Sequence, residues 1–174
     1  MLEERYTHLQ MIGLVVMRVL IGWHFLYEGV AKLLDPNWSA AGYLNAAKGP
    51  MADTFKWMAS TPDILEWVNF LNIWGLTLVG LFLILGLLTR YVAIAGAFMV
   101  LLYYLANPPF IGYFSSVPTE GSYLLVNKNL VEIAALFVIA VTHSGRYAGL
   151  DRIFYRLFHR KGAVEEREFT GATV

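Results

Sequence analysis

The sequence is dominated by long runs of apolar residues, which constrain its fold more than any other feature. Four blocks approach the roughly 20 apolar residues that a helix needs to cross the hydrocarbon core of a bilayer. They span residues 11–34, 65–88, 89–106 and 123–143; the third is short and the fourth carries polar residues. Only 15% of the 174 residues are charged, against about a quarter in soluble domains. We therefore expect an all-α membrane protein, a bundle of four transmembrane helices.

The distribution of basic residues predicts how this bundle is oriented, because cytoplasmic loops are enriched in lysine and arginine. In a four-span arrangement the loops of one side carry Lys48 and Lys56, while Lys32 and Lys128 lie at helix ends. The opposite side receives Arg5, Arg90, Arg146, Arg152, Arg156, Arg160, Lys161 and Arg167. Both termini are therefore expected in the cytoplasm.

The loops and the tail carry further structural signals. Residues 35–63, the first outer loop, are rich in small, aromatic and amide residues, and we expect short helices there on the outer surface. Residues 150–161 place apolar residues at helical spacing opposite arginines, which predicts an amphipathic helix on the anionic inner leaflet or packed on the bundle. We interpret residues 1–162 as one membrane domain and residues 163–174 as a disordered tail.

Composition also excludes several kinds of chemistry. The chain has no cysteine, so disulfide exchange, structural disulfides and iron–sulfur clusters held by thiolates are excluded. Haem held by two histidines needs both at equal depth, but His24 lies past mid-membrane while His8, His143 and His159 lie near the cytoplasmic side, so we expect no haem. A zero net charge gives no sign of nucleic-acid binding, and we expect none.

The first apolar block contains a stripe of ionisable residues. At 100° per residue, Arg18, His24, Glu28 and Lys32 fall within an arc of about 120° on one helix face. A charge that faces lipid costs several kcal/mol, so this stripe should face the other helices. Glu28 is four residues from both His24 and Lys32 and can pair with either. On the fourth helix, which runs the opposite way, Glu132 reaches a similar depth.

These residues predict a polar pocket in the outer third of the bundle, roofed by the outer loops. We interpret His24, Glu28 and Glu132 as catalytic residues that supply or relay protons. The residues expected to bind an anion or a quinone headgroup are Arg18, Lys32, Asn72, Tyr103, Tyr104, Asn107 and Asn129. A metal site of His24, Glu28 and Glu132 would be too sparse a ligand set, so no metal is predicted.

The alternative is that these polar groups only tie the helices together. Lys32 and Lys128 would then extend to the interface, and Arg18 would anchor the inner end on a carbonyl or a lipid phosphate.

Several stretches resemble the DoxX/DoxD-like family of bacterial integral membrane proteins. They are RVLIGWHFLYEGVAKL in the first block, WGLTLVGLFLILGLLTRYVAIAG across the second and third, and NKNLVEIAALFVIA and SGRYAGLDRIF near the end. The positions that match the family pattern are Arg18, Gly22, Gly29, Lys32, Gly80, Gly86, Arg90, Glu132 and Asp151. The resemblance implies four transmembrane helices in a bacterial cytoplasmic (inner) membrane. Some members form the small subunit of a thiosulfate:quinone oxidoreductase, and others associate with redox-stress complexes.

Together the stripe and the resemblance favour a quinone-linked oxidoreductase, or a subunit of one, acting on a small oxyanion such as thiosulfate. The expected cofactor is a quinone, and the expected partners are membrane lipids, a second oxidoreductase subunit and further copies of the chain. Two alternatives remain open: a non-catalytic subunit that anchors a redox partner, and a small-solute transporter.

Overall fold

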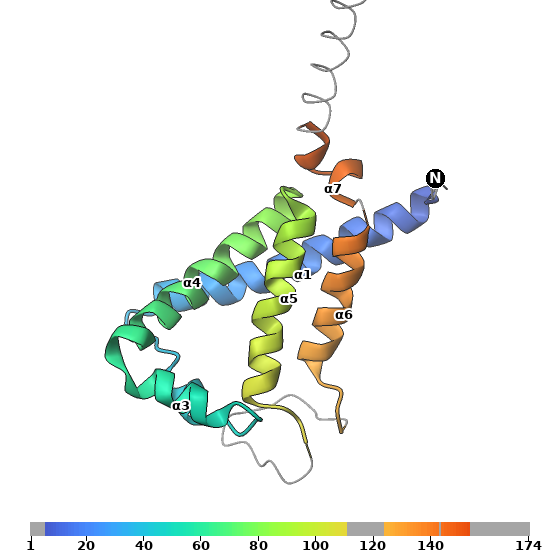
Figure 1. The fold of residues 1–174 in the computed structure, drawn as a ribbon. Coiled ribbons are helices and arrows are strands. Elements are labelled where there is room, and N and C mark those ends of the chain that lie inside the picture. Colours follow the sequence, from blue (N-terminus) through green and yellow to red (C-terminus); the bar gives the residue numbers. More distant parts are fainter. Residues whose placement is uncertain (1–5, 111–123, 143, 154–174) are drawn as a thin grey trace, which may run out of the picture.

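The computed structural model describes residues 6–110, 124–142 and 144–153, and every regular element of more than one residue in these ranges is a helix. Among them α1, α4 and α5 are long and apolar enough to cross a membrane, whereas α6 has 14 residues. The helices are α1 (His8–Leu34), α2 (Ala41–Asn45), α3 (Ala52–Ser60), α4 (Pro62–Leu85), α5 (Thr89–Ala106), α6 (Lys128–Val141) and α7 (Ser144–Tyr147) (Figure 1).

Helix α4 begins and ends three residues earlier than its apolar block, for reasons visible at its ends. Pro62 occupies its first turn, where a missing N–H costs nothing. Gly86 ends the helix with φ +64°, a left-handed conformation that glycine adopts without a steric penalty. The N–H groups of Gly86 and Leu87 then donate to the carbonyls of Leu83 and Phe82. Helix α5 begins at Thr89, so the two helices are joined by three residues.

Helices α1 and α4 cross closely because small residues line their contact. A Cβ atom added at Gly29 would lie 2.5 Å from the backbone nitrogen of Thr77, and one at Gly80 would lie 2.6 Å from the carbonyl oxygen of Gly22. Only glycine lets the two backbones approach this far, which is how many membrane helices associate.

Helix α6 lies against α5, and the core between the two helix pairs is apolar (Figure 1). The most buried side chains of this core include Phe25 of α1, Leu83 of α4 and both Leu136 and Ile139 of α6, each at most 1% exposed.

The two ends of the bundle are closed differently. At one end, called here the α3 end, α2 and α3 pack beneath the helices, and the N–H groups of Lys48 and Gly49 both donate to the carbonyl of Ala106. At the opposite end, the α7 end, α7 lies beside the turn between α4 and α5 (Figure 1). Of the amphipathic helix expected over residues 150–161, only 151–153 are described and helical; residues 154–174, including the predicted tail, lie outside the described ranges.

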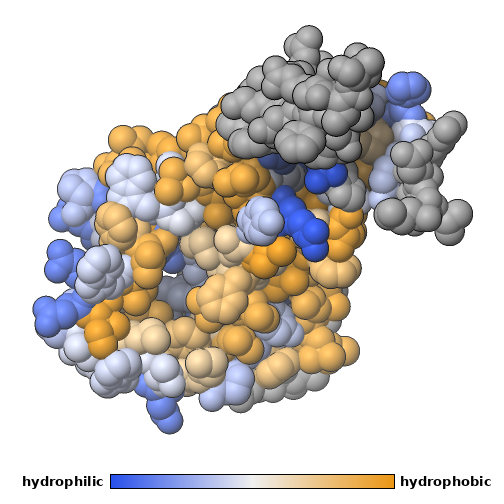
Figure 2. All heavy atoms as spheres, turned by 45° about the horizontal axis from the view of Figure 1, so that its top comes forward, coloured by the Kyte–Doolittle hydropathy of each residue, from blue (hydrophilic) through white to orange (hydrophobic). Residues whose placement is uncertain are grey.

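The outer surface of the helices is apolar. Leu20, Trp23, Trp67, Phe98 and Phe137 are each at least 60% exposed, and they come from α1, α4, α5 and α6. Figure 2 shows one face on which apolar residues predominate, with hydrophilic residues gathered at one margin and beside the grey atoms. Such a surface suits hydrocarbon rather than water.

Candidate functional site

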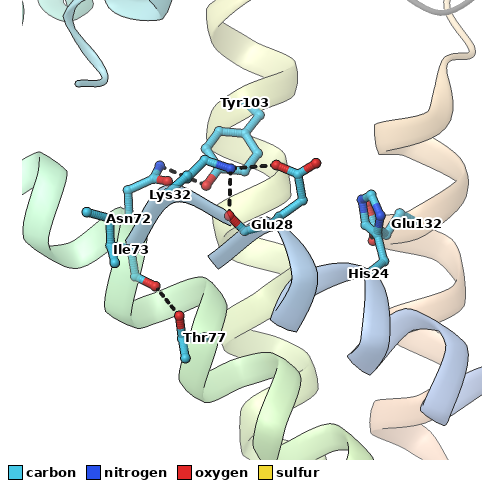
Figure 3. A network of polar contacts seen from close by, with 8 residues as sticks. All are labelled: His24, Glu28, Lys32, Asn72, Ile73, Thr77, Tyr103 and Glu132. Atoms are coloured by element: carbon cyan, nitrogen blue, oxygen red, sulfur yellow. Dashed lines mark hydrogen bonds and ion pairs between the residues drawn. The ribbon is translucent and has the colours of Figure 1, made fainter. Parts of the chain in front are cut away.

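Polar side chains from four helices gather in one region of the bundle and make three contacts, one within α1, one between α1 and α6 and one between α4 and α5 (Figure 3). We call this set the polar layer; it consists of His24, Glu28 and Lys32 from α1, Asn72 from α4, Tyr103 from α5 and Glu132 from α6. The contact between α1 and α6 is made by His24, whose Nε2 lies 3.8 Å from Oε1 of Glu132. The His24 side chain is 47% exposed and that of Glu132 is 15% exposed. Glu132 therefore points inward while His24 lies at the rim.

Glu28 pairs with Lys32 rather than with His24. The Lys32 Nζ lies 2.5 Å from Oε2 of Glu28 and also donates to the Glu28 carbonyl at 3.2 Å. The same ammonium lies 5.7 Å from the centre of the Trp38 ring, which adds a cation–π attraction. Lys32 is thus held over the layer by three groups, and its side chain is only 18% exposed.

Asn72 and Tyr103 form the most buried contact of the layer. Asn72 Nδ2 donates to the Tyr103 hydroxyl at 2.8 Å, and Asn72 Oδ1 is buried without a hydrogen-bond partner in the part of the chain that the structure describes. The Tyr103 oxygen accepts this hydrogen bond, so the hydrogen of the Tyr103 hydroxyl stays free to be donated to another group. If the Asn72 amide is flipped, the Tyr103 hydroxyl donates to the Asn72 oxygen, and the Asn72 NH2 group becomes the donor without a partner in this pair. In either orientation, and among the residues that the structure describes, the pair keeps at least one unused donor and one unused acceptor.

The short helix α2 covers the layer from the α3 end. The Tyr43 hydroxyl donates to the Tyr103 carbonyl at 2.9 Å, and the two rings meet edge to face at 6.1 Å. Burial raises the pKa of the Tyr43 hydroxyl, an effect that neighbouring Asn107 partly opposes. Tyr43 therefore stays protonated and remains a donor. Tyr43 was not predicted from the sequence, where it stands out only as an aromatic residue within the outer loop.

The remaining predicted site residues surround the layer or lie away from it. Tyr104 uses its hydroxyl hydrogen on the carbonyl of Leu125 at 2.9 Å. Asn107 follows the end of α5, where its side chain lies beside the Tyr43 hydroxyl. Asn129 is half-buried in the first turn of α6. Arg18 lies at the α7 end, where Nη2 donates to the carbonyl of Ala148 at 2.6 Å.

The layer combines acidic, basic and neutral hydrogen-bonding groups on otherwise apolar helices. Two carboxylates, one ammonium and one imidazole lie close together, an arrangement that can exchange protons with a bound molecule. Thr77, which Figure 3 also shows, bonds the carbonyl of Ile73 in its own helix at 2.8 Å and lines the contact with α1. In the described ranges, no three His, Asp or Glu residues are grouped so that they could hold a metal ion.

Comparison with known proteins identifies the family. The DoxX family model matches residues 13–107, which is more than half of the chain and runs from α1 to the end of α5. No curated protein and no solved structure matches the chain. The matched region holds the polar stripe of α1, the glycine contact between α1 and α4, and both Asn72 and Tyr103. The chain therefore belongs to the DoxX family and, with its three long apolar helices, is a membrane protein.

Proposed function

We propose that the chain is a quinone-linked membrane oxidoreductase, or the membrane subunit of one, and that the polar layer receives the quinone headgroup. One observation carries the proposal: the 3.8 Å contact between His24 and Glu132 lies in the same layer as the Glu28–Lys32 and Asn72–Tyr103 contacts. Ionisable groups from separate helices that meet among apolar residues mark functional sites in membrane proteins.

The chemistry of the layer fits this reaction. Reduction of a quinone to a hydroquinone takes up two electrons and two protons. His24 and Glu132 would supply the protons, and Glu28, whose carboxylate is paired with Lys32, would relay them. Tyr103 and Asn72 would hydrogen-bond the headgroup, because the pair has an unused donor for a carbonyl and an unused acceptor for a hydroxyl. The electrons would come from a small oxyanion such as thiosulfate, or from a second subunit.

The proposal includes a topology with four spans. Helix α6 is about 21 Å long, shorter than the hydrocarbon core, but the apolar residues Leu124–Val126 precede it. It lies along α5 and buries Leu136 and Ile139 in the common core. Because arginines gather at the α7 end, we place that end and both termini in the cytoplasm of a bacterium, with α2 and α3 on the outer face of its cytoplasmic membrane.

The test is to purify the protein in native lipid, extract it, and measure bound quinone by mass spectrometry and quinone reduction by absorbance. Glu132→Gln and His24→Gln should lower the reduction rate by about 100-fold, the usual contribution of a proton-transferring side chain. Glu66→Gln is the matched control, because Glu66 is an exposed glutamate in the first turns of α4. Equal rates in all three variants, or a protein that retains no quinone, would contradict the proposal.

A second candidate function is a non-catalytic subunit that anchors a redox partner. It is favoured by the exposure of His24 and Glu28, whose side chains are 47% and 45% exposed although they lie in an apolar helix. A partner that covered them would remove the cost of placing charge against lipid. Cross-linking in native membranes distinguishes the two, since an anchoring subunit would capture its partner equally well with Glu132→Gln.

A further inference from the structure

The segment from Ser144 to Ile153 docks on the turn between α4 and α5 through its backbone. The N–H of Leu150 donates to the carbonyl of Leu85 at 3.0 Å, and the N–H of Asp151 donates to the carbonyl of Gly86 at 2.9 Å. A Cβ atom added at Gly86 would lie 2.8 Å from the Cα of Gly149, so the backbones of the two segments are in direct contact. The segment thus extends the hydrogen bonding of the turn itself.

The side chain of Asp151 completes the start of α5. Its two carboxylate oxygens accept the N–H groups of Leu88 at 2.7 Å and Thr89 at 3.0 Å. Leu88 itself occupies the capping position of α5 and its apolar side chain cannot accept these hydrogens. A carboxylate at a helix N-terminus also interacts favourably with the helix dipole. Helix α5 therefore depends on a cap that lies 62 residues further along the chain.

The docked segment also covers a charge whose hydrogen bonds are incomplete. Arg18 is 2% exposed and Nη2 bonds Ala148, but Nε and Nη1 are buried without partners among the described residues. Within the same ranges, the hydroxyl groups of Thr89 and Ser144 are likewise buried without partners. Asp151 attracts the guanidinium, yet its oxygens are engaged by the start of α5. Burying donors in this way is costly, and water would satisfy all four atoms if the segment moved away.

We propose that residues 144–153 form a latch that seats and leaves as one unit, closing the α7 end of the bundle over Arg18. In the seated state α5 is capped and Arg18 is covered. In the released state α5 loses its cap and Arg18 is hydrated. The two states exchange one set of hydrogen bonds for another, which is the property of an element that switches rather than deforms.

Release would open the inner end of the polar stripe on α1. Arg18 and His24 are six residues apart, which is about 9 Å along the helix. The latch thus controls whether water and anions reach the buried end of the stripe from the α7 side. This role does not depend on the proposed function, because it rests on contacts at the opposite end from the polar layer.

The absence of cysteine from the chain allows a direct test with Ser144→Cys, since Ser144 is 0% exposed and lies in the latch. In purified protein in lipid nanodiscs, this cysteine should react with a maleimide at least tenfold more slowly than one at exposed Tyr147 (Tyr147→Cys). Adding Asp151→Asn should raise the Ser144→Cys rate at least tenfold, because an amide has one acceptor oxygen and cannot accept both the Leu88 and the Thr89 N–H groups as the carboxylate does. The matched control, Asp35→Asn, should leave the rate unchanged, because Asp35 is exposed and its side chain accepts the N–H of nearby Asn37, far from the latch.

Equal reaction rates for the two cysteines, or no effect of Asp151→Asn, would overturn the latch. Hydrogen exchange on the unsubstituted protein keeps the test independent of any folding defect. The amides of Leu88, Thr89, Leu150 and Asp151 come from two segments, and a latch requires them to exchange through one common opening. That opening should be more frequent than the opening of the α4 core. Separate rates for the two segments would also overturn the proposal.

Discussion

At the scale of single residues, two adjacent tyrosines of α5 have hydroxyls with different uses. The Tyr104 hydrogen is donated to Leu125, whereas the Asn72–Tyr103 pair keeps a donor unused. We expect Tyr103→Phe to weaken quinone binding about tenfold, the effect of losing one hydrogen bond of roughly 1.4 kcal/mol. Tyr104→Phe should leave binding unchanged. Titration of each variant with a soluble quinone measures both constants, and equal weakening in the two variants would count against a headgroup at Tyr103.

Much of the polar layer could be predicted from helical spacing, because Glu28 and Lys32 are one turn apart on the same helix. Glu132 could also be placed near the depth of His24, because the helices that carry them were expected to run in opposite directions. The two residues do lie in contact, although they are far apart in the chain. The alternative in which Arg18 anchors on a carbonyl is confirmed by its bond to Ala148, but which carbonyl it binds could not be predicted from spacing. Ala148 lies 130 residues away and offers only a backbone carbonyl, which carries no sequence signature.

At the scale of helices, the crossing of α1 and α4 gives a prediction with a control on the same helix. A Cβ atom at Gly29 would press on the backbone of Thr77, whereas one at Gly13 would meet nothing within 4 Å. Gly29→Ala should therefore cost about 1–3 kcal/mol, lowering the melting temperature by about 2–10 °C. Gly13→Ala should not lower it. Tryptophan fluorescence during heating in detergent measures both, and a matching loss in Gly13→Ala would show that the contact is unimportant.

Element boundaries followed local signals where such signals existed. Helix α5 spans residues 89–106 as expected, and the ends of α4 follow from Pro62 and Gly86 once each is assigned to its position in the helix. Helix α7 was not expected, because four residues have no periodicity to recognise. Its place beside the α4–α5 turn is set by Arg18 and Asp151, which are tertiary partners.

At the scale of the whole molecule, the two ends of the bundle have different chemistry. Near the α3 end the polar layer leaves His24 and Glu28 about half exposed. At the α7 end Arg18 is covered, and its nearest partners belong to a segment held by backbone hydrogen bonds. A molecule in the polar layer would thus be reached from the α3 end or from within the membrane while the latch is seated.

The orientation of these ends can be measured in cells. Lys48 at the α3 end and Arg90 at the α7 end are both exposed, so cysteines placed there should react wherever reagent reaches them. Because arginines favour the cytoplasmic side, a membrane-impermeant maleimide should label Lys48→Cys in intact bacteria and spare Arg90→Cys. Permeabilised cells should show labelling of both. Labelling of Arg90→Cys in intact cells would reverse the topology and place the latch, rather than the polar layer, toward the outside.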